Sequence, residues 1–228
     1  MSSPRTLPAP QSPGDGFQVE RYEVALRPDL ATTAISGSQV IDLIATSPDL
    51  REIVFSPNGL EIGDATFDGS PIPVVSNENG IGFTLPQPLA VGESVRLQFT
   101  LRGLPARGVT MVPNGMYTGY FGCDWMVCLQ NSPGDKADLQ LDLFLPDGTV
   151  SLGVGAPTET VDLPGDLTLH RWHSDRPTSP YLFAFAIILP VTAVFGFVAA
   201  GREIKVLAED PIWLENMTLH INWPDQAA

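Results

Sequence analysis

Histidines are the first residues to consider, because imidazole is the commonest metal ligand in proteins. His170 and His173 lie three apart beside Asp175, and His220 is distant in the sequence. The usual zinc helix, His-Glu-x-x-His, is missing from the sequence. On a strand, residues three apart point to opposite faces, so a shared metal would need a bulge. The spacing therefore favours two ordinary strand histidines and predicts no metal site.

Cys123 and Cys128 are the only cysteines, and they lack the C-x-x-C spacing of zinc and redox motifs. We expect buried or partly buried free thiols, with a disulfide within the loop as the alternative. A chain of 228 residues can bury a core without disulfides, and free thiols fit a reducing compartment. No apolar signal-peptide segment follows Arg5. We therefore expect a cytoplasmic protein.

Other motifs for nucleophilic or phosphate chemistry are missing from the sequence as well. Segments 36–39 and 178–181 lack the strand-turn-helix context of a nucleophilic serine. Segment 153–159, "GVGAPTE", has neither the glycine spacing nor the lysine of a phosphate loop, so a turn between strands explains it. The acidic pairs Asp15 with Glu20 and Glu209 with Asp210 are typical of solvated surface. We therefore predict no catalytic, cofactor-binding or metal-binding residue and no cofactor.

The charge balance excludes one class of partner. Lys and Arg number 12 against 26 Asp and Glu, which gives a net charge of −14 and repels nucleic acid. The 22 prolines and 21 glycines indicate many turns and short strands.

Short β-type runs separated by turn residues fill the sequence from residue 17. "FQVERYEVALRP" (17–28) places Tyr22, Val24 and Leu26 at period two, which predicts a half-buried strand. We expect hairpin turns at "FDGSPIP" and "NENGIGF", because Asp-Gly and Asn-Gly supply positive φ. "GMYTGYFG" (115–122) is interpreted as an aromatic loop. Further strands are expected at 34–46, 51–57, 60–69, 72–77, 81–86, 94–103, 136–146, 167–174, 181–189 and 202–210. The prediction is a disordered Pro/Ser-rich tail over 1–16 and a single all-β domain, an antiparallel sandwich or open sheet, over 17–228.

Six short motifs follow one another along the chain. They are Tyr22-x-x-x-Leu26-x-Pro28-Asp29, Ile35-x-Gly37, "LPQPLAVGESVRLQFTLRG" (85–103), Gly115-x-Tyr117, "SPGDKA" (132–137) and "HRWHSDRPTSPYLFAF" (170–185). Together they resemble the amino-terminal domain of the aminopeptidase N family of zinc metallopeptidases over residues 18–210. The resemblance implies a saddle-like β-domain that precedes a thermolysin-like catalytic domain and closes one side of its substrate cleft. The His-Glu-x-x-His zinc motif of that catalytic domain does not occur in the sequence, and the resemblance implies that such a domain would begin near residue 228.

The chain departs from the family in one loop. The family carries a Gln or Glu that reaches the active site, then an Arg and a Pro-Cys-x-Asp segment, where this chain has the shorter "FGCDWMVCLQNS". Asp124 falls near the Arg position and Asn131 near the Asp position, so neither charge is kept. Neither Gln130 nor Gln140 is assigned the substrate-contacting role.

Residues 181–200 form an uncharged run of 20, long enough for a membrane span. Pro190, Thr192 and Gly196 interrupt it, and flanking charges give no orientation. We favour two buried strands joined by a Pro turn. Beyond it, residues 216–223, which end at Trp223 and follow Trp213, predict an added strand. The alternative is an apolar patch for a partner or a second copy, with self-association through the strand edge as a minor outcome.

These observations predict a non-catalytic binding or docking domain whose partner is a peptidase catalytic domain or another protein. Any peptidase activity would then require a separate zinc domain. The alternatives are a subunit or fragment of a zinc aminopeptidase and a membrane-attached accessory protein.

Overall fold

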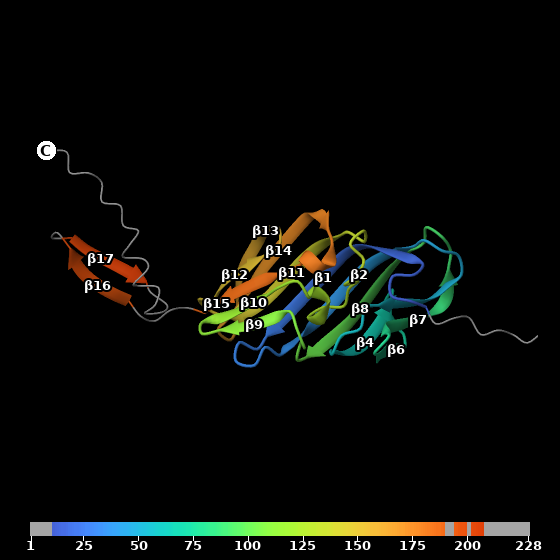
Figure 1. Cartoon of the computed structure of the whole chain (residues 1–228), viewed down its shortest axis with the longest axis horizontal. Helices are drawn as coiled ribbons and strands as arrows, with labels where there is room; N and C mark the ends of the chain where they lie inside the picture. The colour runs from blue at the N-terminus through green and yellow to red at the C-terminus, as the bar shows by residue number, and fades with distance from the viewer. Residues whose placement is uncertain (1–10, 190–193, 200–201, 208–228) are drawn as a thin grey trace, which may run out of the picture.

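The computed structural model describes residues 11–189, 194–199 and 202–207, and these are almost entirely β-structure (Figure 1). No helix in this part of the chain has the length and apolar character needed to cross a membrane. The strands run in chain order as β1 Phe17–Pro28, β2 Ile35–Ala45, β3 Leu50–Phe55, β4 Glu61–Phe67, β5 Ser70–Pro71, β6 Val74–Asn77, β7 Gly80–Leu89, β8 Ser94–Gly103, β9 Val109–Val112, β10 Gly115–Thr118, β11 Ala137–Pro146, β12 Val150–Gly153, β13 Ala156–Leu163, β14 Leu167–Thr178, β15 Phe185–Ile188, β16 Val194–Ala199 and β17 Arg202–Leu207.

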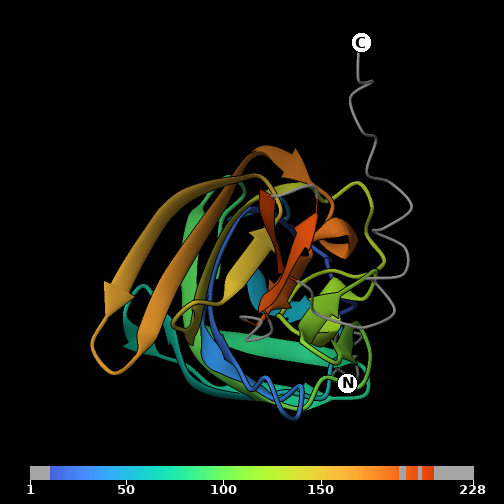
Figure 2. The ribbon, with the colours of Figure 1, turned by 90° about the vertical axis from the view of Figure 1, so that its left-hand side faces the viewer.

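An eight-stranded sheet forms the body of the molecule, in the order β13-β14-β11-β1-β2-β8-β4-β5. It curves strongly around the smaller sheets, as the end-on view shows (Figure 2). Its pairs are antiparallel with one exception: β1 and β11 run parallel, with Tyr22 opposite Leu139 and Val24 opposite Leu141. β1 therefore joins the beginning of the chain to a strand far along it.

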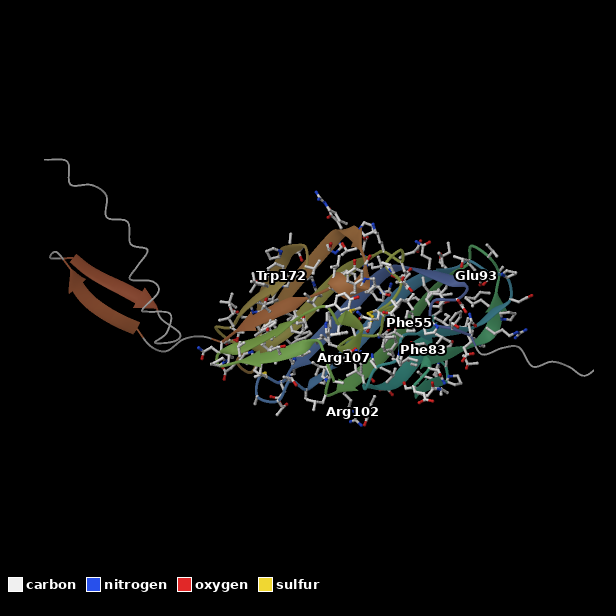
Figure 3. The ribbon with its side chains drawn as sticks, viewed as in Figure 1. Phe55, Phe83, Glu93, Arg102, Arg107 and Trp172 are labelled. Carbon is white, nitrogen blue, oxygen red and sulfur yellow. A yellow bond between two sulfur atoms is a disulfide. The ribbon has the colours of Figure 1, made fainter. Side chains whose placement is uncertain are left out.

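Two smaller sheets, β3-β7-β6 and β12-β15-β10-β9, share one core with the large sheet. Period-two alternation places Tyr22, Val24 and Leu26 of β1 on the buried face. From the three-stranded sheet, Phe55 and Phe83 meet edge to face at 6.0 Å between ring centroids (Figure 3). At the other end, Trp172 of β14 donates its indole N–H to Ser151 of β12 at 3.0 Å. This contact links the large sheet to the four-stranded one.

Gly37 shows how closely the central strands approach. A Cβ at this position would lie 2.0 Å from the backbone oxygen of Ala25 on β1. Only glycine fits there without moving a backbone, which explains the Ile35-x-Gly37 step seen in the sequence.

The predicted all-β, open-sheet class is confirmed, and β1 has the bounds expected for it. The Asp-Gly turn is also confirmed, since Asp68 and Gly69 both have positive φ between β4 and β5. The second hairpin forms one residue earlier than expected: Glu78 and Asn79 make the turn and Gly80 begins β7. Segment 115–122, interpreted as a loop, begins with strand β10.

The predictions at the two ends of the chain have mixed outcomes. Residues 13–16, inside the expected tail, form a turn, and the Gly14 N–H donates to the Val54 carbonyl at 2.9 Å. Strands β15 and β16 occupy the 181–200 run, and β16 pairs with β17. The proposed turn at Pro190, residues 1–10 and the predicted strand at 216–223 lie outside the described residues.

Candidate functional site

The loop that joins β10 to β11 is buried over its middle half. Residues 122–130 are all buried, although only the short 3₁₀ turn Gly122–Asp124 has regular structure. A buried segment without a strand ladder must find other partners for its backbone N–H and C=O groups.

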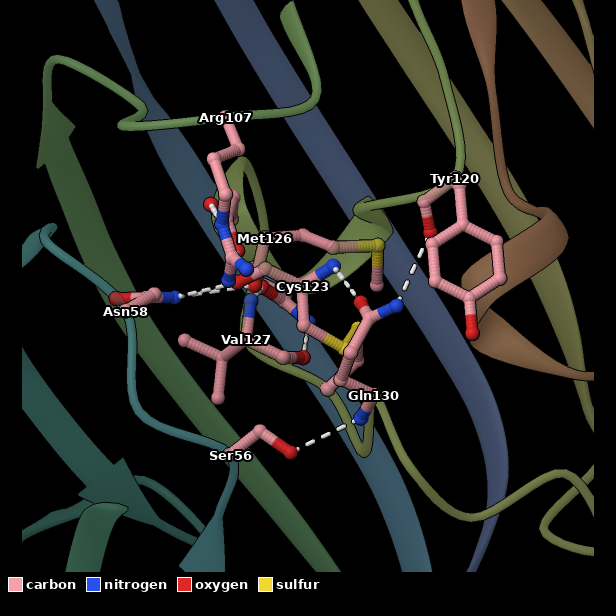
Figure 4. Close-up of a disulfide and its surroundings, with 11 residues drawn as sticks. Ser56, Asn58, Arg107, Tyr120, Cys123, Met126, Val127 and Gln130 are labelled. Atoms are coloured by element: carbon pink, nitrogen blue, oxygen red, sulfur yellow. Dashed lines mark hydrogen bonds and ion pairs between the residues drawn. A yellow bond between two sulfur atoms is a disulfide. The ribbon is translucent and has the colours of Figure 1, made fainter. Parts of the chain in front are cut away.

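Four polar side chains supply those partners, and three of them, Ser56, Asn58 and Gln130, are labelled in Figure 4. Gln39 of β2, fully buried, donates to the Val127 carbonyl at 2.7 Å and accepts from the Val127 N–H at 2.9 Å. Asn58 donates its amide to the carbonyls of Cys123 and Met126 at 3.0 and 3.1 Å. The loop is thus held by side chains from β2 and from the segment after β3.

Gln130 and Ser56 complete the set. Gln130 accepts from the Cys123 N–H at 3.2 Å and donates to the Tyr120 carbonyl at 3.0 Å, while its own N–H donates to Ser56 Oγ at 2.9 Å. The Gln130 side chain is therefore committed to the loop's own backbone. It is a structural residue here, consistent with leaving it out of any substrate-contacting role.

Cys123 and Cys128 form a disulfide inside this loop, so the expectation of free thiols is wrong. The 3₁₀ turn that follows Phe121 folds the chain back and brings the two Cα atoms to 5.0 Å, within bonding reach. Burial was anticipated correctly, since the cysteines are 1% and 0% exposed. The disulfide also removes free thiols as an argument for a reducing compartment.

An ion pair stands at the outer edge of the loop. Arg107 binds both carboxylate oxygens of Asp124 at 3.0 Å and stacks over the Phe121 ring at 4.2 Å. The hydrogen bonds to Asp124, followed by its charge, raise the pKa of Arg107. Asp124, near the family's Arg position, is thus balanced by an arginine from another segment. Beside the pair lies a pocket of about 330 Å³, lined in part by Gln130 and Asn131.

Burial raises the pKa of two acidic groups in this region, Tyr22 of β1 and Asp135 of the loop itself. Burial, and secondarily the charge of Asp135, raises the pKa of Tyr22 well above its ordinary value. Burial likewise raises the pKa of Asp135, although the Val19 N–H, at 3.3 Å, opposes this shift. Tyr22 therefore stays neutral and acts as a core residue.

His170 and His173 lie apart from this loop, on β14, and His220 lies outside the described residues. His170 pairs with Leu143 and His173 with Gln140 across the sheet. Burial lowers the pKa of His170, whose Nε2 is buried without a hydrogen-bond partner. Among the described residues, no group of three His, Cys, Asp or Glu is placed to hold a metal ion. The absence of any metal, cofactor or catalytic residue stays a prediction.

The outer side of the large sheet, which faces away from the core, is strongly charged. Arg171 of β14 binds Asp142 at 2.7 and 2.8 Å and also pairs with Glu159. Arg96 of β8 joins Asp42 of β2. Gln140, the second glutamine considered from the sequence, accepts from Arg21 on this side at 3.1 Å. This side of the molecule is built for solvent.

The outer side of the four-stranded sheet is different. Residues directly opposite in a sheet share a face, and two adjacent rows here are almost wholly apolar. We call this surface the outer apolar face; it consists of Val112, Tyr117, Val150, Leu152, Ala186 and Ile188. Tyr117 is 46% exposed and Leu152 56%. The alternate row, with Met116 and Ile187, points into the core.

Comparison with known proteins identifies the fold. Neither a family model nor a curated protein matches the sequence. Among solved structures, the M1 zinc metallopeptidase from Deinococcus radiodurans matches with a TM-score of 0.72 at 19% identity. This chain has the fold of an M1 zinc metallopeptidase domain. The match covers 86% of this chain and 48% of the Deinococcus chain, so the chain spans about half the length of that protein.

The same coverage and identity hold for a two-domain M1 zinc metallopeptidase mutant bound to L-tryptophan, also with a TM-score of 0.72. The resemblance to the aminopeptidase N family seen in the sequence is thus confirmed for the fold.

Sequence reasoning missed the disulfide, the structural roles of Gln39 and Asn58, and the outer apolar face. One signal was present for Gln39. It occupies the apolar register Ile35, Gly37, Gln39, Ile41, Leu43 of β2, so alternation alone places it in the core.

Proposed function

We propose that this chain is a non-catalytic docking domain of a zinc peptidase and binds a peptidase catalytic domain through its outer apolar face. Catalysis would then reside on the zinc-binding domain, whether this chain is a subunit or a fragment of the aminopeptidase. The observation that carries the proposal is that face, which exposes contiguous apolar side chains, whereas ion pairs occupy the outer side of the large sheet.

The choice of occupant follows from the comparison. The similar structures include a two-domain zinc metallopeptidase, and the match covers 48% of its chain. The other half of such a chain is the natural partner for an apolar surface on this half. A depression of about 260 Å³ on the same face, lined by Tyr117, Leu152 and Ala186 among others, offers a seat for a protruding side chain.

A cytoplasmic location is retained as part of the proposal. Because Cys123 and Cys128 form a disulfide, free thiols no longer support a cytoplasmic location. Nucleic acid remains an unsuitable partner on grounds of charge.

Binding can be tested with a defined probe. The zinc-binding half of the Deinococcus peptidase, co-expressed with this chain, should co-purify at one to one. Tyr117→Glu should weaken binding at least tenfold, because a carboxylate would be desolvated in the interface. Val75→Glu is the matched control, since Val75 is 57% exposed but lies on β6 of the other small sheet. Equal binding by Tyr117→Glu and the parent would refute this interface.

Activity supplies the second test. The purified chain alone should hold less than stoichiometric zinc and should not hydrolyse aminoacyl anilides. Turnover together with one tightly bound zinc per chain would overturn the non-catalytic assignment.

A further inference from the structure

The buried loop depends on its disulfide more than a strand would. Residues 122–130 have no sheet ladder, so their position rests on side chains of neighbouring segments and on the covalent ring closed by Cys123 and Cys128. The ring spans a sequence separation of five and is almost completely inaccessible to solvent.

Each half-cystine anchors the loop to the segment after β3. The Cys123 carbonyl accepts from the Asn58 amide, and the Cys128 carbonyl accepts from the Ser56 N–H at 3.1 Å. Asp124, which follows Cys123, carries the pair with Arg107 at the mouth of the pocket. A change in the S–S bond therefore acts on both the anchors and the pocket.

We propose that the Cys123–Cys128 bond is a redox latch: the closed disulfide holds residues 119–132 against β2 and the segment after β3, and reduction releases them and opens the pocket beside Arg107. Two thiols need more room than one disulfide, because the sulfurs move from bonding to van der Waals distance. A close-packed interior has no spare room for that change. Unlike the docking proposal, this inference requires no partner.

The reaction is thiol–disulfide exchange with a dithiol reductant. One reductant thiolate attacks a cystine sulfur, which gives a mixed disulfide and frees one protein thiolate. The second reductant thiolate then attacks the reductant sulfur of the mixed disulfide and frees the other protein thiolate. Two electrons and two protons pass to the protein, leaving two protein thiols and a cyclic disulfide. A disulfide oxidant closes the bond again by the reverse exchange. Because the sulfurs are buried, attack waits for the loop to open, so reduction should be slow in the native protein.

The covalent state has an unambiguous readout, since the chain contains two cysteines in all. Native protein purified without reductant should take no iodoacetamide and weigh two hydrogens less than the dithiol form. Dithiothreitol should reduce it at least tenfold faster in urea than in buffer. Native protein that takes iodoacetamide without reductant would overturn the latch.

The structural consequence is measured by hydrogen exchange on the full chain. Reduction should speed exchange in residues 119–132 at least tenfold while β11, residues 137–146, stays protected. The double variant Cys123→Ala with Cys128→Ala should behave like the reduced protein, melt about 4–8 °C lower and ignore reductant. If that variant does not fold, reduced wild-type protein gives the same measurement. Unchanged exchange of 119–132 after reduction would refute the proposal.

Discussion

Replacement of Gln39 by methionine tests whether side chains hold the buried loop in place. Methionine has nearly the same shape as glutamine, so the change removes two hydrogen bonds without creating a large cavity. It leaves both the N–H and the carbonyl of Val127 buried without their partner. Each stripped group costs about 1–3 kcal/mol, so the free energy of unfolding should fall by about 2–6 kcal/mol. That is a large part of the ~5–15 kcal/mol that stabilises a typical domain.

Urea unfolding followed by circular dichroism measures this loss, and a central cost near ~4 kcal/mol corresponds to a melting temperature about 8–16 °C lower. Gln98→Met is the matched control. Gln98 lies opposite Val40 on the neighbouring strand β8 but is exposed, so the same substitution should change stability by less than about 0.5 kcal/mol. A loss below about 1 kcal/mol for Gln39→Met would show that water or local movement satisfies Val127, and the reasoning would be refuted.

Three further predictions concern the core, an ion pair and pH. Phe185→Asp should abolish cooperative unfolding in circular dichroism. The ring centroids of Phe185 and Trp125 lie 5.1 Å apart in the core, so the new carboxylate would be buried beside Trp125. A folded variant would contradict this prediction. Asp142→Asn should cost about 1–2 kcal/mol in urea unfolding by weakening the two bonds from Arg171, whereas neutralising the exposed ion pair between β4 and β8 should cost almost nothing. Burial lowers the pKa of His170, so the neutral form is favoured in the folded state and its stability contribution is lost as pH falls below about 6.5. The melting temperature of His170→Gln should therefore decline less than that of the parent between pH 7 and 5; identical profiles would count against it.

The large sheet could be predicted because its strands are long and half-buried. In β1 and β8 apolar and polar residues alternate over many positions, so periodicity reports the buried face directly. The strands that escaped prediction give no such signal. β9, β10 and β12 have four residues each, and β13 is exposed along nearly all of its length. These strands are recognised only through the neighbours that pair with them.

The candidate site was harder to predict because its contacts are distant in sequence. Val127 and Gln39 are 88 residues apart, and Asn58 reaches Cys123 across 65. No local pattern encodes such a bond. The disulfide escaped for a related reason: a spacing of five matches no motif, and the 3₁₀ turn that closes it depends on the packing around it. The pairing of the strands likewise decides which apolar residues face solvent, so the outer apolar face could not be predicted before the register was known.

The parallel pairing of β1 with β11 has a consequence for synthesis of the protein. Arg21 and Gln140 touch although 119 residues separate them, so the central strand pair cannot form until residues 137–146 have left the ribosome. Until then β1 has β2 on one side and an open row of N–H and C=O groups on the other. Such an edge recruits other strands, including those of neighbouring nascent chains. The sheet must therefore be completed late and through contacts of long sequence separation, which makes folding slow. Chains cut short before β11 should accumulate as aggregates, whereas a cut after residue 146 would leave β1 paired on both sides.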